Sequence, residues 1–153
     1  MTVLVDADAC PVKRIIVEEA RRRGVSVTML TDTSHVLRED YAAVVTVEKG
    51  RDSVDFKLVT LCGAGDVVVT QDYGVAAMAL GKGAYGIHQS GRWYTNDNIG
   101  GLLMDRHLAA KSRRASGKHH LKGPKKRTPE DDAQYAASLE RLLDNIEAKE
   151  TQI

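Results

Sequence analysis

The sequence predicts an α/β protein: a three-layer α/β/α sandwich with a central, mainly parallel sheet, followed by C-terminal helices. Short, continuous apolar runs recur along the first part of the chain, and such runs are typical of strands buried on both faces. Segments with apolar residues at helical spacing separate most of these runs. Strands that alternate with helices predict a parallel sheet covered by helices on both faces.

The first strand is expected at residues 3–5, because this apolar run stops at an acid. A helix should follow from Pro11, since proline is favoured at the first helical position, and should end at Gly24. Two further apolar runs predict the second and third strands, at residues 25–30 and 43–47.

The next helix is expected at residues 51–62, with an inward side formed by Val54, Leu58, Leu61 and Cys62. The fourth strand is expected at residues 67–70, before a short helix at 73–81 that packs through Val75, Met78 and Ala79. Residues 84–88 form either a fifth strand or the first arm of a hairpin. The expected strand order is 3-2-1-4-5, with right-handed crossovers.

Two helices are expected beyond the sheet. The first covers residues 96–115, with a buried side formed by Ile99, Leu102 and Leu103. The second begins after Thr128, because a hydroxyl cap, a proline and first-turn acids favour a helix start there. Its apolar stripe consists of Tyr135, Leu139, Leu142, Leu143 and Ile146. That stripe is expected to cover either the sheet or a partner subunit, and in the second case the protein would be a homodimer.

Charge is distributed in blocks, although the formal net charge is only +1. Residues 1–105, the expected α/β core, have a net charge of −3. Residues 106–129 carry nine basic residues and no acid, and residues 130–153 have a net charge of −5. Blocks of this kind usually mark interaction surfaces. The chain therefore divides into the core at 1–105, a basic helix end and loop at 106–128, and an acidic amphipathic helix at 129–150.

The composition is that of an ordinary globular protein, with 42% hydrophobic and 28% charged residues. No apolar run approaches the roughly 20 residues that a membrane-spanning helix needs, and the amino terminus lacks the pattern of a signal peptide. Cys10 and Cys62 lack metal-site spacing and are expected to be reduced thiols. These features predict a cytoplasmic protein without a membrane partner.

Acidic residues follow several of the predicted elements. Asp6 and Asp8 come after the first strand, and Asp72 comes after the fourth. Because the carboxyl ends of parallel strands meet at one edge of the sheet, these three side chains should converge. Asp52 and Asp55 lie three residues apart on one helix face, and either could join them. Converging carboxylates repel unless a cation is present, and oxygen ligands suit Mg²⁺ or Mn²⁺. We therefore expect Asp6, Asp8 and Asp72 to bind a divalent cation.

The basic block is the second candidate functional feature, because phosphate backbones attract such segments without reading sequence. The alternative is a solvated basic surface that balances the acidic terminal helix. The expected nucleic-acid-binding residues are Lys13, Arg106, Arg113, Arg114, Lys118, Lys122, Lys125, Lys126 and Arg127. RNA, or another phosphate-bearing substrate, is the expected partner.

Four segments resemble the YaiI/YqxD family of bacterial proteins: VDADACPVK at 5–13, TQDYGVA at 70–76, YTNDNI at 94–99 and GPK at 123–125. The resemblance runs along almost the whole chain, in order. It implies a PIN-like fold for the core, a class whose best-known members are metal-dependent ribonucleases. In those enzymes an Asp ends the first strand, an acid lies on a following helix, and an Asp follows the fourth strand in a Thr-x-Asp setting.

Carried over to this sequence, the resemblance implies a catalytic set of Asp6, Asp55 (or Asp52) and Asp72, with Asp8 as an additional acid. The helix acid is usually Glu in the nucleases, which is a departure. The leading hypothesis is a Mg²⁺- or Mn²⁺-dependent ribonuclease. Asp6-x-Asp8 also fits a haloacid-dehalogenase-type phosphatase, with Asp6 as nucleophile and Asp8 as acid/base. The third hypothesis is a non-catalytic RNA- or nucleotide-binding protein.

Overall fold

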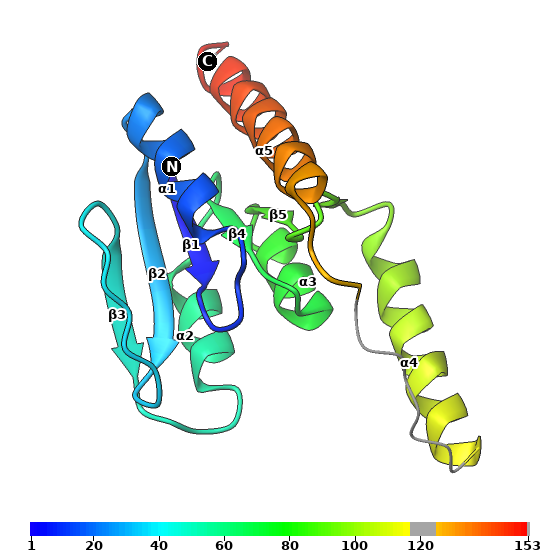
Figure 1. The fold of residues 1–153 in the computed structure, drawn as a ribbon. Helices are drawn as coiled ribbons and strands as arrows, with labels where there is room; N and C mark the ends of the chain where they lie inside the picture. Colours follow the sequence, from blue (N-terminus) through cyan, green and yellow to red (C-terminus); the bar gives the residue numbers. More distant parts are fainter. Residues whose placement is uncertain (117–124, 153) are drawn as a thin grey trace.

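A computed structural model of the protein describes residues 1–116 and 125–152. One sheet of six strands forms its centre, in the order β3-β2-β1-β4-β5-β6 (Figure 1). The strands are β1 (Thr2–Asp6), β2 (Ser26–Asp32), β3 (Ala43–Val47), β4 (Val67–Val69), β5 (Tyr85–Ile87) and β6 (Trp93–Tyr94). Strands β1 to β5 pair in parallel, and β6 pairs antiparallel with β5. The predicted α/β class and strand order are confirmed, and residues 84–94 contain both a fifth strand and a hairpin.

Five helices accompany the sheet in the described part of the chain. They are α1 (Lys13–Arg23), α2 (Ser53–Leu61), α3 (Tyr73–Gly81), α4 (Ile99–Ser116) and α5 (Pro129–Glu150). Helix α1 begins two residues after the predicted Pro11 and ends at Gly24, whose φ of +70° favours glycine. Helix α5 begins as predicted, with a capping box between Thr128 and Asp131.

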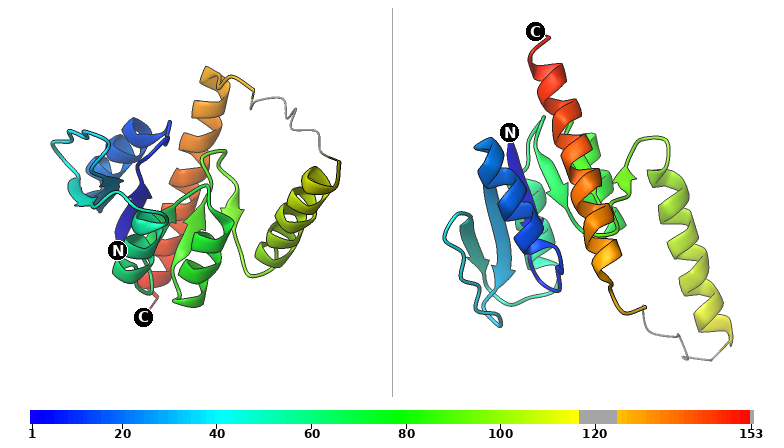
Figure 2. Two further views of the ribbon diagram at one scale, coloured as in Figure 1. Left: turned by 90° about the horizontal axis from the view of Figure 1, so that it is seen from below. Right: turned by 45° about the horizontal axis from the view of Figure 1, so that its top comes forward.

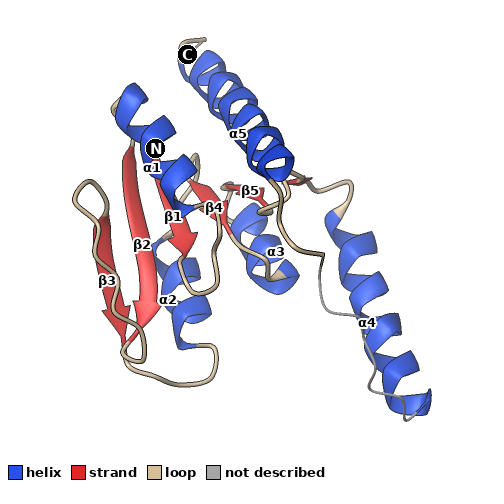
Figure 3. Ribbon diagram, in the orientation of Figure 1, coloured by secondary structure: helices blue, strands red, loops and turns tan. Residues whose placement is uncertain are grey.

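Helices α1 and α5 lie on one face of the sheet and α2 and α3 on the other, so both faces are covered as the sequence predicted (Figure 3). Alternate residues of β1 show the division: Val3 and Val5 pack with α1 and α5, whereas Leu4 packs with α2 and α3. The predicted α5 stripe is fully buried against the first of these faces, so it covers the sheet of its own chain; its members are Tyr135, Leu139, Leu142, Leu143 and Ile146.

Three residues predicted to face inward are instead exposed. Leu61 of α2 is 43% exposed, Met78 of α3 is 52% exposed and Leu103 of α4 is 37% exposed. The buried stripes of these helices are narrower than the apolar pattern suggested. In α2, for example, Leu58 and the following Cys62 are buried and lie one turn apart, which leaves Leu61 beside the contact.

Helix α4 runs outward beyond the β6 edge of the sheet, well separated from α5 in all views (Figure 2). It packs on α3, and most of its residues are exposed. Among the described residues, no helix is both long and apolar enough to cross a membrane.

Candidate metal and phosphate site

The candidate site lies where the direction of strand succession reverses. The chain places β2 and β3 on one side of β1, and then β4 and β5 on the other side. The register pairs Val5 with Val69, so the residues that follow both strands emerge side by side. Ligand sites in open parallel sheets form at such a switch point, beyond the carboxyl ends of the strands.

Asp6 is the last residue of β1, and Asp72 follows β4 after the buried Thr70. The Asp72 backbone N–H donates to Thr70 Oγ1 at 3.0 Å, which fixes the turn between β4 and α3. Asp72 Oδ1 accepts from the backbone N–H of Val75 at 3.0 Å and so caps α3. Asp72 therefore stabilises the start of α3 as well as lining the candidate site.

The structure distinguishes the two helix acids, Asp52 and Asp55, between which the sequence left the choice open. Asp55 lies in the first turn of α2 and lines the same cavity as Asp6 and Asp72. Asp52 occupies the position just before the helix, with a φ of +61° and a side chain that is 76% exposed. It does not line that cavity.

The cavity has a volume of about 750 Å³ and gathers all four acids that were predicted as catalytic: Asp6, Asp8, Asp55 and Asp72. Asp105 of α4 also lines it. The residues thus come from β1, its following loop, α2, the start of α3 and α4. Segments far apart in sequence therefore meet at one cavity.

The acids influence one another electrostatically. The pKa of Asp6 is raised to about 6, first by burial and then by the negative charges of Asp55 and Asp8, with a smaller contribution from Asp72. The pKa of Asp55 is also raised, by burial and then by Asp72 and Asp52, whereas the positive charge of Arg106 acts in the opposite direction. The converging carboxylates therefore repel one another, and a bound cation would relieve this repulsion.

Basic side chains also line the cavity. Arg92, from the β5–β6 connection, and Arg106 and Arg113, from α4, line it together with Tyr73, Gln71, Ala9, Leu102 and Ala109. Arg106 Nη1 lies 3.7 Å from Asp72 Oδ1. Arg92 Nη2 donates to the Tyr73 hydroxyl at 3.2 Å, and its guanidinium lies over the Tyr73 ring. Arg92 and Tyr73 were not predicted, since no local sequence pattern joins these two segments.

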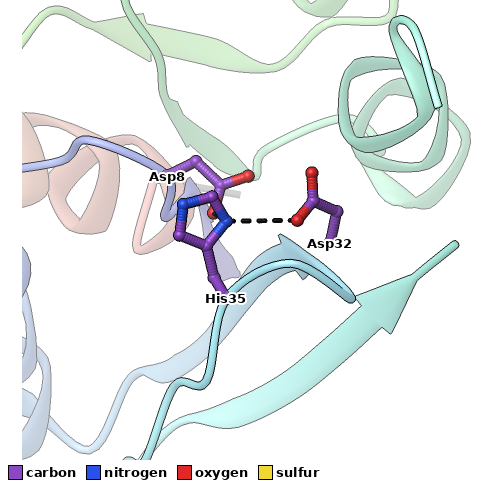
Figure 4. A group of neighbouring side chains, drawn as sticks. All are labelled: Asp8, Asp32 and His35. Carbon is purple, nitrogen blue, oxygen red and sulfur yellow. Dashed lines mark hydrogen bonds and ion pairs between the residues drawn. The ribbon is translucent and has the colours of Figure 1, made fainter. Parts of the chain in front are cut away.

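A second group of ligand-type atoms lies beside the cavity. Asp8, Asp32 and His35 each place one ligand atom within 4.8 Å of the others, the one such group of three among the described residues (Figure 4). His35 Nδ1 lies 3.3 Å from Asp8 Oδ1 and 3.1 Å from Asp32 Oδ1, and Thr31 donates to Asp8 Oδ1 at 2.6 Å.

Asp6, Asp8 and Asp72 therefore share a cavity but are not gathered as closely as that second group, as far as the described residues go. Asp32 and His35 were missed by sequence reasoning. Asp32 ends β2, the strand beside β1, so the rule that selected Asp6 would have selected it as well. Its carboxylate also accepts from the backbone N–H of Ser34 at 2.9 Å and closes a turn.

The predicted basic residues are distributed over several places. Arg106 and Arg113 line the cavity, and Arg114, Lys125 and Lys126 are exposed outside it. Lys13 faces another groove and donates to the Ala7 carbonyl at 3.4 Å. Arg127 forms an ion pair with Asp132 at 2.6 Å. Lys118 and Lys122 lie outside the described residues.

Comparison with known proteins gives the family. A family model described as "Uncharacterized BCR, YaiI/YqxD family" matches residues 4–145. A UPF0178 protein of Clostridium acetobutylicum is 57% identical over 94% of this chain and 97% of its own length. A UPF0178 protein of Lachnoclostridium phytofermentans is 50% identical over 95% of this chain and 99% of its own. No solved structure matches the chain. The chain belongs to the YaiI/YqxD family.

Proposed function

We propose that the protein is a divalent-cation-dependent phosphodiesterase that cleaves RNA. One observation carries this proposal: a single cavity at the switch point of the sheet is lined by five aspartates and three arginines. Carboxylates suit a cation, and guanidinium groups suit a phosphate. A phosphodiester bound in this cavity would be in contact with both kinds of group.

The donor set fits Mg²⁺ or Mn²⁺, because both prefer carboxylate oxygens and water. Asp6, Asp8 and Asp72 would hold the ion, after side-chain rotations that bring their oxygens together. The ion would activate water and stabilise the charge of the phosphodiester as it is cleaved. Asp55 lines the same cavity, and its raised pKa suits a residue that accepts a proton from water.

The arginines would bind the phosphates of the substrate, since a planar guanidinium matches two phosphate oxygens at once. Outside the cavity, the exposed Arg114, Lys125 and Lys126 would attract the rest of a nucleic-acid strand by charge. The polymer is proposed to be RNA because of the PIN-like resemblance, while the charges themselves favour any polyphosphate chain.

The phosphatase alternative is less well supported. That chemistry needs a further pair of acids near Asp6 and Asp8, and the late pair in this sequence is Asp131 and Asp132. Both are engaged at the start of α5: Asp131 forms the capping box with Thr128, and Asp132 pairs with Arg127. The remaining alternative is a protein that binds RNA or a nucleotide in this cavity but does not cleave it. A cleavage assay separates it from the proposed phosphodiesterase.

Cation binding is the first test of the proposal. Titration calorimetry should detect Mn²⁺ binding to the wild type and at least about tenfold weaker binding to Asp72→Asn, because a ligand's charge is lost. Asp97→Asn is the control, since it removes the same charge from an exposed residue that does not line the cavity. Equal Mn²⁺ affinity in wild type and Asp72→Asn would remove Asp72 from the site.

A further inference from the structure

Arg106 lies among the acids of the cavity that it lines. Its guanidinium lies 3.7 Å from Asp72 Oδ1, and its positive charge offsets part of the rise in the pKa of Asp55. It therefore neutralises part of the negative charge in the cavity, although it is one of the three arginines proposed to bind phosphate. The pair is partly open to solvent, with side-chain exposures of 57% for Arg106 and 32% for Asp72.

The helix that carries Arg106 forms the cavity wall with one face. Leu102, Arg106, Ala109 and Arg113 recur at intervals of three or four residues and line the cavity together. Helix α4 packs on α3, and Asp72 caps α3. The packing of these two helices therefore keeps Arg106 close to Asp72. Arg92 differs, because the group to which it donates is the neutral hydroxyl of Tyr73.

A guanidinium that pairs with Asp72 is less available to a phosphate. A divalent cation on Asp72 would weaken this ion pair, because it carries twice the charge of the guanidinium and binds the oxygen directly. Arg106 would then face a cavity that also contains Arg92 and Arg113. A phosphate entering that cavity would meet a guanidinium that has lost its carboxylate partner.

We propose that Arg106 couples cation binding to phosphate binding: it pairs with Asp72 until a divalent cation takes that carboxylate, and it then binds a phosphate of the substrate. This inference rests on the proposed function, and it adds the order in which the two ligands act. Arg92 binds phosphate whether or not the cation is present, because its hydroxyl partner does not bind the cation.

The test measures both ligands separately in the full-length protein. Mn²⁺ affinity is measured by calorimetry without RNA, and the affinity for a short fluorescent oligouridylate is measured by anisotropy with and without Mn²⁺. Gels run after each titration identify any cleaved RNA. Circular dichroism verifies that each variant is folded.

In the wild type, Mn²⁺ should tighten oligouridylate binding, and oligouridylate should tighten Mn²⁺ binding by the same factor. Arg106→Gln should bind Mn²⁺ roughly two- to fivefold more tightly without RNA, because the positive charge that competes for Asp72 is gone. A factor of this size corresponds to the free energy of a typical exposed ion pair. Its oligouridylate affinity should match the wild type without Mn²⁺, and the increase with Mn²⁺ should be largely lost.

Two further variants separate this coupling from simple loss of charge. Arg92→Gln should weaken oligouridylate binding by a similar factor with and without Mn²⁺, while Mn²⁺ affinity and the coupling stay as in the wild type. Arg141→Gln removes an exposed arginine of α5 and should leave the coupling unchanged.

Arg106→Gln with unchanged or weaker Mn²⁺ affinity, or with the wild-type coupling factor, would overturn the inference but leave the proposed function standing. A wild-type protein that binds oligouridylate but no Mn²⁺ would overturn both. The two failures are distinguishable because the wild-type titration alone tests the proposed function.

Discussion

Asp6→Asn is expected to abolish Mn²⁺-dependent RNA cleavage, with a rate at least about 100-fold below that of the wild type. Asp6 lines the cavity, where burial and three other carboxylates raise its pKa. Loss of its charge removes a proposed direct ligand of the cation. Even residues that only hydrogen-bond to metal ligands commonly change metal affinity or activity 10- to 100-fold when they are mutated. The measurement is a time course of labelled RNA on denaturing gels, with EDTA as the blank.

The helix acids provide a matched comparison within the same assay. Asp55→Asn should lower the rate strongly because Asp55 lines the cavity, whereas Asp52→Asn should cleave at the wild-type rate because its side chain is exposed outside it. Wild-type cleavage by Asp6→Asn would indicate a contaminating nuclease or another site. Hydrolysis of p-nitrophenyl phosphate by the wild type, without RNA cleavage, would favour the phosphatase instead.

Asp6→Asn is also expected to stabilise the protein in EDTA near neutral pH. The folded-state pKa of Asp6 is about 6, above its ordinary value of 3.8, so the folded state binds this proton more tightly than the unfolded state. Ionisation of Asp6 therefore lowers the free energy of unfolding progressively as the pH rises from about 4 to about 6. With allowance for solvent screening, the cost near neutral pH is about 1–2 kcal/mol.

The asparagine variant lacks this cost, so its melting temperature should exceed that of the wild type by roughly 2–6 °C near neutral pH. The difference should shrink below pH 6 and largely disappear near pH 4, where Asp6 of the folded wild type is protonated. Saturating Mn²⁺ should reverse the order, since it stabilises only the protein that binds it. A gap in melting temperature that does not change with pH would contradict this account of Asp6.

The acids of the site were predictable because their positions follow from backbone rules. Asp6 ends β1 and Asp72 follows β4, and these adjacent parallel strands bring both residues to one edge of the sheet. The choice between Asp52 and Asp55 was not predictable, because it depends on where α2 begins. The left-handed conformation of Asp52 turns the chain just before that helix, so only Asp55 lies within its first turn.

The arginines of the cavity were predictable only in part, for a different physical reason. Arg106 and Arg113 were selected by charge alone, and nothing in the sequence indicated that α4 would face the acids. Arg92 and His35 lie on connections, whose paths depend on tertiary packing. Periodicity likewise marked Leu61 and Met78 as apolar positions of helices, but it could not fix how much of each helix the sheet covers.

An anomalous difference map from a crystal soaked in Mn²⁺ would reveal directly whether the acids of the cavity bind a divalent cation. A peak is expected in the cavity, within coordination distance of carboxylate oxygens of Asp6, Asp8 and Asp72. A map without a peak in the cavity, or with one only between Asp8, Asp32 and His35, would contradict this expectation.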